Sequence, residues 1–214
     1  MHLEFLVEDS SGKRFLEQIL PVALGNGHTF RVIEYKGIGT IPANLHKAPH
    51  PAAKSLLSNL PKALNGYGRA YRGIPFAVVV VCDLDDQDEA TFRAELDAVL
   101  AGCSVPPEAR FCLSIEEMEA WLLGDRMAIL AAYPKAKPAA LNAYVQDSIC
   151  GTWEHLADAV FPGGAKELSR RPYSEIGAAK HEWAATIPPH MDLSRNVSPS
   201  FNAFLATLGE LVAG

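Results

Sequence analysis

Residues 76–82 read Phe-Ala-Val-Val-Val-Val-Cys, and this run constrains the fold more than any other part of the chain. It contains no polar side chain, so a strand made of it must be covered on both faces, as at the centre of a parallel sheet. The run is far shorter than the roughly 20 apolar residues that cross a bilayer as a helix. We therefore expect an α/β fold with a mostly parallel sheet flanked by helices.

The first 35 residues predict a strand, a helix and a second strand. Residues 3–7 are mainly apolar, and Ser10 or Ser11 then caps a helix that Pro21 is expected to end. Residues 30–35 form the next strand. A unit this compact implies two parallel strands joined by a right-handed crossover.

The middle of the chain predicts two more strands and their helices. Four prolines in residues 41–71 indicate a mostly irregular segment with one short helix over residues 52–60. The central strand follows, then a helix over residues 89–100 and a fourth strand over residues 110–115. Ser114-Ile115-Glu116-Glu117 matches a capping box, which predicts a helix from there to Tyr133.

Beyond residue 135 the pattern favours helices without a convincing strand. Three helices are predicted, around residues 153–160, 176–186 and 199–212. Ser198 followed by Pro199 is typical of the start of the last one. We expect an α/β core over residues 1–133 and a helical C-terminal extension over residues 134–214 that packs on it.

The formal net charge of −6 excludes a generally basic nucleic-acid binder, but the charge is unevenly distributed. Residues 31–72 carry seven basic side chains and one acid, a net charge of +6. Residues 83–119 carry eleven acids and two basic side chains, a net charge of −9. This pattern suits a metal-dependent enzyme that acts on phosphates, and two unrelated solvated surfaces would produce it equally well.

The N-terminal sequence, Met1-His2-Leu3-Glu4-Phe5, does not place an apolar stretch after a basic region. We therefore expect no signal peptide, a cytoplasmic location and no membrane partner.

Four acidic residues follow predicted strands: Glu8 after the first, Asp83 and Asp85 after the central one, and Glu119 in the helix after the fourth. The carboxyl ends of parallel strands meet at one edge of a sheet, where α/β proteins bind ligands. Two carboxylates about 4 Å apart repel each other by about 4 kcal/mol, and a cation removes this cost. Oxygen ligands without His or Cys favour Mg²⁺ or Mn²⁺. An acidic turn that caps the next helix would also explain Asp83 and Asp85.

Three short motifs carry a family resemblance. Val7-Glu8 after the first strand, Asp83-Leu84-Asp85 after the central strand and Glu119-Ala120-Trp121 resemble the Toprim-type fold, which is Rossmann-like. More specifically, the chain is similar to a bacterial family of unknown function related to RloB and to the OLD nucleases. The most specific part is Ile-Glu-Glu-Met-Glu-Ala-Trp-Leu-Leu-Gly-Asp at residues 115–125. The Toprim features cover residues 1–133, and residues 180–183 and 198–201 resemble that bacterial family alone.

The resemblance implies roles for the acidic residues. Glu8 would assist proton transfer or bind metal, Asp83 and Asp85 would hold Mg²⁺ for phosphodiester chemistry, and Glu119 would complete the carboxylate set. A cation near the phosphate would help, with Lys36 as the first candidate and Lys180 as the second. Each lysine could equally be a solvated surface residue.

The chain departs from the family pattern after Glu8. The family continues with glycine, a residue, a hydroxyl residue and then a second acid, whereas this chain reads Asp9-Ser10-Ser11-Gly12. Ser11 fits the hydroxyl position, but Asp9 replaces the glycine and Gly12 replaces the second acid.

Two functions of different classes follow. The first is a Mg²⁺- or Mn²⁺-dependent phosphoryl-transfer enzyme, a nuclease-like hydrolase of bacterial defence or DNA maintenance with a nucleic acid or nucleotide as substrate. The second is a non-catalytic module of the same fold that binds a nucleotide or an unidentified partner protein. The missing acid at Gly12 favours the second, and the clustered carboxylates favour the first.

Overall fold

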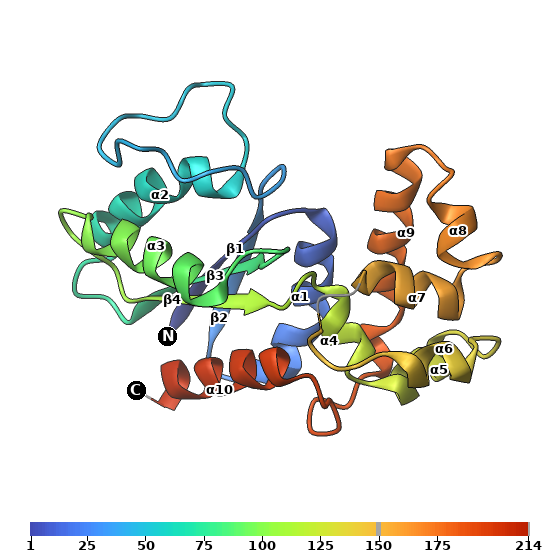
Figure 1. Ribbon diagram of the computed structural model, residues 1–214. Helices are drawn as coiled ribbons and strands as arrows, with labels where there is room; N and C mark the ends of the chain where they lie inside the picture. The colour runs from blue at the N-terminus through green and yellow to red at the C-terminus, as the bar shows by residue number, and fades with distance from the viewer. Residues whose placement is uncertain (149–150, 214) are drawn as a thin grey trace.

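The computed structural model describes residues 1–148 and 151–213, which form an α/β fold around a four-stranded parallel sheet (Figure 1). The strands are β1 (His2–Val7), β2 (Thr29–Glu34), β3 (Phe76–Asp83) and β4 (Ala109–Ser114), in the order β2-β1-β3-β4. Each neighbouring pair is parallel. The expected parallel sheet is confirmed, and the apolar run forms β3, an inner strand that is buried from Phe76 to Cys82.

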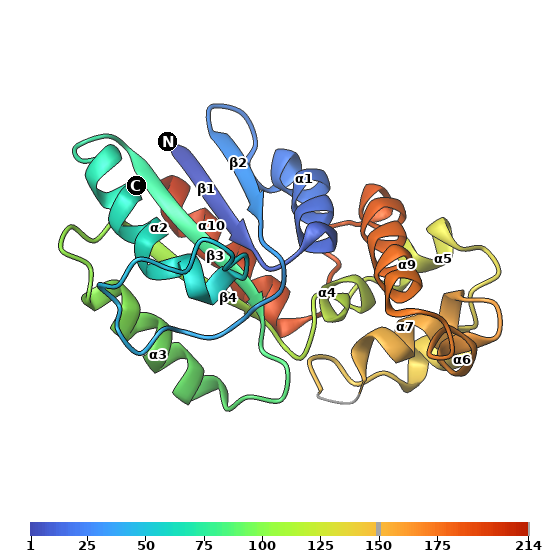
Figure 2. The ribbon, with the colours of Figure 1, turned by 90° about the horizontal axis from the view of Figure 1, so that it is seen from above.

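Helices cover both faces of the sheet (Figure 2). These helices are α1 (Ser10–Leu24), α2 (Leu56–Ala70), α3 (Glu89–Ala101) and α10 (Pro199–Ala213). Successive side chains of a strand point to opposite faces, so the two faces bury separate apolar clusters. Phe5 lies on the face that α1 and α10 cover, whereas Val80 lies on the face that α2 and α3 cover.

The rest of the chain forms short helices beside the sheet, at the right of Figure 1. They are α4 (Glu119–Leu123), α5 (Arg126–Ala132), α6 (Pro138–Ala143), α7 (Thr152–Val160), α8 (Gly164–Leu168), α9 (Tyr173–Thr186) and the 3₁₀ turn η1 (Pro188–His190). The three helices expected near residues 153–160, 176–186 and 199–212 are α7, α9 and α10, whereas α6 and α8 were not predicted.

After α9 the chain returns to the sheet, because α10 packs against β4 and α1. Ser198 caps this helix as expected, since its Oγ accepts a hydrogen bond of 3.2 Å from the Phe201 amide. The ring of Phe204 packs on Trp121 with centroids 4.9 Å apart, and on Phe5 with centroids 6.5 Å apart. The apolar core of this face is therefore shared between the first and the last element of the chain.

Pro21 does not end a helix as the sequence predicts. Pro21 lies inside α1, which continues to Leu24 and ends at Gly25, where φ is +62°. Pro21 and Glu17, whose carbonyl loses its helical partner, are both exposed, so water can solvate that carbonyl.

The segment expected to be mostly irregular contains the 15-residue helix α2, and the short helix expected over residues 52–60 was therefore wrong in its bounds. Pro61 lies inside α2. Burial of Leu56, Leu60 and Leu64 against the sheet outweighs the cost of a proline in the helix.

The predicted capping box at residues 114–117 was wrong. Ser114 ends β4 and its hydroxyl bonds the carboxylate of Asp83, whereas Glu116 has a φ of +60°, outside the helical region. Instead of one helix to Tyr133, two short helices follow, and Asp125 caps the second by accepting a hydrogen bond from the Ala128 amide. The local capping box does not form, and Glu116 instead contacts residues farther along the chain, as described below.

None of the helices in the described part of the chain is sufficiently long and apolar to span a membrane.

Candidate functional site

The sheet places Glu8 and Asp83 beside each other. Glu8 is the first residue after β1, Asp83 is the last residue of β3, and the register pairs Val7 with Val81. The two carboxylates lie close enough for the charge of Glu8 to raise the pKa of Asp83. The prediction that these acids meet at the carboxyl edge of the sheet therefore agrees with the geometry.

Glu8 is partly buried at the strand end. Burial, together with the neighbouring Asp85 and Asp9, raises the pKa of its carboxyl to about 7. Lys180 and the backbone amide of Ile38 oppose this shift. A carboxyl with a pKa near neutrality can hold a proton and release it at physiological pH.

Asp83 is the most perturbed of these acids. Burial raises its pKa well above the usual range, and Glu8 raises it further. The ammonium of Lys180 and the hydroxyl of Ser114, which donates a hydrogen bond to Oδ1, both favour the ionised form. Ser114 reaches Asp83 because the two residues are register partners on β3 and β4.

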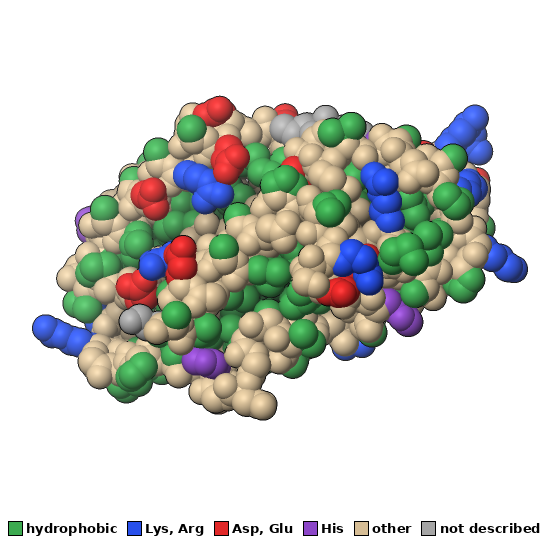
Figure 3. All heavy atoms as spheres, turned by 90° about the horizontal axis from the view of Figure 1, so that it is seen from below, with side chains coloured by type: hydrophobic (Ala, Val, Ile, Leu, Met, Phe, Trp, Pro, Cys, Tyr) green, Lys and Arg blue, Asp and Glu red, His purple; other side chains and the backbone are tan. Residues whose placement is uncertain are grey.

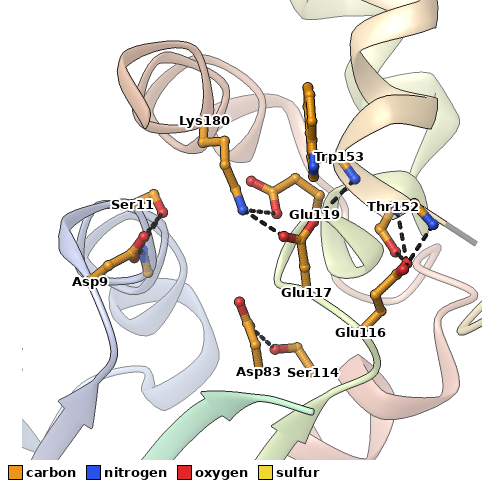
Figure 4. Close-up of polar contacts among 12 residues, drawn as sticks. Asp9, Ser11, Asp83, Ser114, Glu116, Glu117, Glu119, Thr152, Trp153 and Lys180 are labelled. Atoms are coloured by element: carbon orange, nitrogen blue, oxygen red, sulfur yellow. Dashed lines mark hydrogen bonds and ion pairs between the residues drawn. The ribbon is translucent and has the colours of Figure 1, made fainter. Parts of the chain in front are cut away.

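Lys180 on α9 supplies a cation to this edge of the sheet. Its Nζ lies 3.1 Å from Oε1 of Glu117 and 3.3 Å from Oε2 of Glu119 (Figure 4). Burial lowers the pKa of this ammonium, but Glu119, Glu117 and Asp83 outweigh burial and raise the pKa above its usual value. Lys180 is therefore a charged group in the centre of the acidic cluster.

Glu119 is the first residue of α4 and is 3% exposed. Burial raises the pKa of its carboxyl to about 7, although Lys180 lowers it, and Glu117 adds to the increase. In Figure 4 the side chains of Asp83, Glu117 and Glu119 point toward Lys180. We call Glu8, Asp83, Glu117, Glu119 and Lys180 the carboxylate–lysine cluster.

Two of the predicted site residues lie outside this cluster. Asp85 is exposed on the turn after β3, where φ is +51°, although its charge still reaches Glu8. Lys36 is exposed on the loop after β2, and within the described residues its ammonium forms no ion pair. Its backbone instead binds the carbonyl of Lys54. The structure thus brings Lys180, the second candidate cation, to the carboxylates, and leaves Lys36 at the surface.

The departure at residues 9–12 has a structural role. Asp9 is the N-cap of α1, and its Oδ1 accepts hydrogen bonds of 2.8 Å from the Gly12 amide and from the Ser11 hydroxyl. A Cβ at Gly12 would lie 3.3 Å from the Met118 side chain, 3.4 Å from the Asp9 carboxylate and 3.6 Å from Val7, so the space around this position is filled. The helix start therefore holds Asp9 in place and leaves little room for an acid at Gly12.

The sequence predicts Glu117 as the acid of a local capping box and not as part of the site, and it gives Glu116 no role of its own. In the structure, Glu116 accepts hydrogen bonds of 2.8 Å from the amides of Gly151 and Thr152, at the N-terminus of α7, and from the Thr152 hydroxyl. Glu117 accepts a bond of 3.3 Å from the Trp153 amide. The acids themselves are visible in the sequence, as Asp83 and the closely spaced Glu116, Glu117 and Glu119. Their partners lie far along the chain, so no local pattern indicates them.

A divalent cation fits this site only in part. Among residues 1–148 and 151–213, no three His, Cys, Asp or Glu side chains are arranged to hold a metal ion. The donors are nevertheless hard oxygens, and the buried Oε2 of Glu8 has no hydrogen-bond partner in this part of the chain. Oε2 of Glu119 makes its ion pair with Lys180 without hydrogen-bond geometry. As the side chains stand, the Lys180 ammonium and not a set of metal ligands lies among these carboxylates.

Comparison with known proteins found no matching family model, no matching curated protein and no matching solved structure.

Proposed function

We propose that this chain is a Toprim-like, Mg²⁺- or Mn²⁺-dependent phosphoryl-transfer enzyme, nuclease-like in its chemistry, that acts in the bacterial cytoplasm in defence or DNA maintenance. One observation carries the proposal. Glu8 after β1, Asp83 at the end of β3 and Glu119 at the start of α4 lie, with raised pKa values, around the partly buried ammonium of Lys180. Such clustering of perturbed acids at the carboxyl edge of a parallel sheet is typical of a functional site.

The side chains have distinct parts in the proposed reaction. Asp83, Glu119 and Glu8 would hold the metal ion, which would neutralise charge on the attacked phosphate and lower the pKa of a bound water. Glu8, with a pKa of about 7, would take the proton from the attacking water. Lys180 would move from its carboxylate partners to a phosphate oxygen, where its charge stabilises the developing negative charge.

The test is cleavage of labelled DNA and RNA under Mg²⁺ and Mn²⁺ titration, with Asp83→Ala compared with the wild-type chain. Asp97→Ala is the matched control, because Asp97 is an exposed acid on α3. Metal-dependent cleavage that survives Asp97→Ala and is abolished by Asp83→Ala supports the proposal. Absence of cleavage in the wild-type chain over the whole panel overturns it.

A second function has its own observation. The Lys180 ammonium already pairs with Glu117 and Glu119, so a lysine stands where an ion would be expected. This arrangement favours a non-catalytic module of the same fold that binds a nucleotide or a partner protein. In that case Mg²⁺ leaves the melting temperature unchanged, and nucleotide binding is insensitive to Asp83→Ala.

A further inference from the structure

A groove of about 650 Å³ lies on the outer side of α2, away from the carboxylate–lysine cluster. Its lining includes His46, Lys47, Lys62, Asn65, Arg69 and Ser104. Three of these side chains are cationic, and no acidic residue of the described chain lines the groove. We call it the basic groove. Its positive charge comes from the segment that carries seven of the basic residues of the sequence.

The cations of the basic groove are free to bind a ligand. Lys47, Lys62 and Arg69 are exposed, and none of them takes part in an ion pair within residues 1–148 and 151–213. Elsewhere arginines pair with acids, as Arg93 does with Glu89 and Arg171 with Glu167. Unpaired like charges around one groove repel one another, and a polyanion removes that repulsion.

The groove is built on a helix surface and is partly preorganised. Lys62, Gly66 and Arg69 lie on one face of α2, because residues four and seven positions apart share a face. The Arg69 guanidinium donates a hydrogen bond of 3.2 Å to the Ser104 hydroxyl, which donates one of 3.1 Å to Asn65. This chain of bonds orients one of the three cations before any ligand arrives.

Gly66 stands between Lys62 and Arg69 without a structural reason. A Cβ there would meet no atom within 4 Å, and its backbone is helical, so alanine would make a better helix. The missing side chain lets an extended ligand approach the helix surface between the two cations.

The basic groove connects to the sheet edge through one segment of the chain. The Gly37 amide bonds the Glu8 carbonyl at 3.0 Å, and the Leu56 amide bonds the Gly37 carbonyl at 3.0 Å. The loop between these points carries Lys47, and α2 begins at its end. Lys62 lies about 9 Å along the helix axis from Leu56, so a strand of several nucleotides is long enough to reach both places.

We propose that the basic groove binds the phosphate backbone of a nucleic-acid strand. The opposite side of the molecule does not offer such a surface, since Figure 3 shows its basic side chains scattered and interspersed with acids. The inference rests on the proposed function, because it names a nucleic-acid strand rather than a mononucleotide as the ligand. Sequence-independent contacts of this kind depend on salt concentration.

The experiment measures binding without turnover. Fluorescence anisotropy of a labelled 20-nucleotide single-stranded DNA, and of the same sequence as RNA, is recorded in EDTA over a range of salt concentrations. The combined change of Lys47, Lys62 and Arg69 to Gln is expected to weaken binding at least about tenfold and to reduce the salt slope by about 2. The control changes Lys135 and Lys137 to Gln, because both are exposed and neither lines the groove.

A second variant distinguishes binding in the groove from nonspecific attraction to positive charge. Gly66→Leu leaves the charge unchanged, and its Cβ would meet no atom within 4 Å, so we expect the fold to be retained while the groove is obstructed. Weaker binding by this variant and by the triple variant, with wild-type binding by the control, supports the inference. Equal affinity of the wild-type chain and both groove variants, an equal loss in the control, or equally tight binding of polyglutamate overturns it.

The same assay distinguishes the two proposals. If the wild-type chain binds nucleic acid through the basic groove but cleaves none of the substrates with Mg²⁺ or Mn²⁺, the proposed function fails and the groove stands. If the triple variant binds and cleaves as the wild-type chain does, the groove fails and the proposed function stands.

Discussion

The ammonium of Lys180 lies 3.3 Å from Oε2 of Glu119, so a carboxylate that is 4% exposed in α4 is neutralised by a cation from α9. The side chain of Lys180 is itself only 18% exposed. Charges taken out of water in this way stabilise the fold only while both partners remain, because an uncompensated buried charge is costly.

Without the Lys180 ammonium, the carboxylates of the carboxylate–lysine cluster should therefore repel one another. We expect Lys180→Met to lower the free energy of unfolding at pH 8 by about 3 kcal/mol without divalent ions, measured by urea denaturation. Lys166→Met, at an exposed position of α8, is the control and should change little. If the carboxylates can hold a cation, excess MgCl₂ restores part of the loss in Lys180→Met. No restoration by Mg²⁺ contradicts the proposed metal site.

The metal-free chain should lose stability as pH rises through neutrality. The pKa of Glu8 is raised from 4.5 to about 7 in the folded chain, so the folded state holds a proton that the unfolded state releases. The contribution is full below about pH 4.5 and is lost as pH approaches 7, a change of about 3 kcal/mol. Urea midpoints at pH 5 and pH 8 should differ less in Glu8→Gln than in the wild-type chain. Glu17→Gln, an exposed acid of α1, should keep the wild-type pH dependence.

The contact between Glu116 and the start of α7 predicts a local stabilisation. The carboxylate accepts bonds from the Gly151 and Thr152 amides and from the Thr152 hydroxyl, so Glu116→Ala removes the acceptor for buried helix donors. We expect a loss of about 2 kcal/mol in urea denaturation, and a smaller loss for Glu116→Gln, which keeps one acceptor. A loss no larger than that of Asp97→Ala contradicts this role.

Asp125 should stabilise the chain at neutral pH and not in acid. It is 1% exposed and accepts bonds of 2.9 and 2.8 Å from Arg195. Burial raises the pKa of Asp125, but Arg195 and the amides of Asp192 and Ala128 outweigh burial and lower it below its usual value. Its stabilisation is therefore present above about pH 4 and is lost as pH falls. Asp125→Asn should cost about 3 kcal/mol at pH 7 and progressively less below pH 4.

The sheet and its edge could be predicted because local patterns specify them. The apolar run at Phe76–Cys82 requires an inner parallel strand, and parallel strands bring Glu8 and Asp83 to the same edge without further information. The start of the last helix is equally local, since Ser198 and Pro199 adjoin it.

The remainder depends on contacts between residues far apart in the chain. Glu117 fits a local capping box with Ser114, yet it pairs with Lys180, and the adjacent Glu116 adopts a positive φ and accepts a bond from Thr152. The sequence around Lys180 does not distinguish it from a surface lysine. The position of α9 in the fold brings it next to Glu119. At Pro21 a local rule fails. A proline is expected to end the helix there, but α1 continues because the carbonyl that loses its hydrogen-bond partner is exposed to solvent.

The contact between Phe5 and Phe204 has a consequence for the order of folding. The strand β1 cannot complete its packing until α10 has been made, so this part of the core closes only after all the intervening elements have been synthesised. Contacts of such large sequence separation slow folding, since the loop between them must first be ordered. A ribosome-bound chain that lacks α10 therefore keeps aromatic surface exposed until that helix emerges.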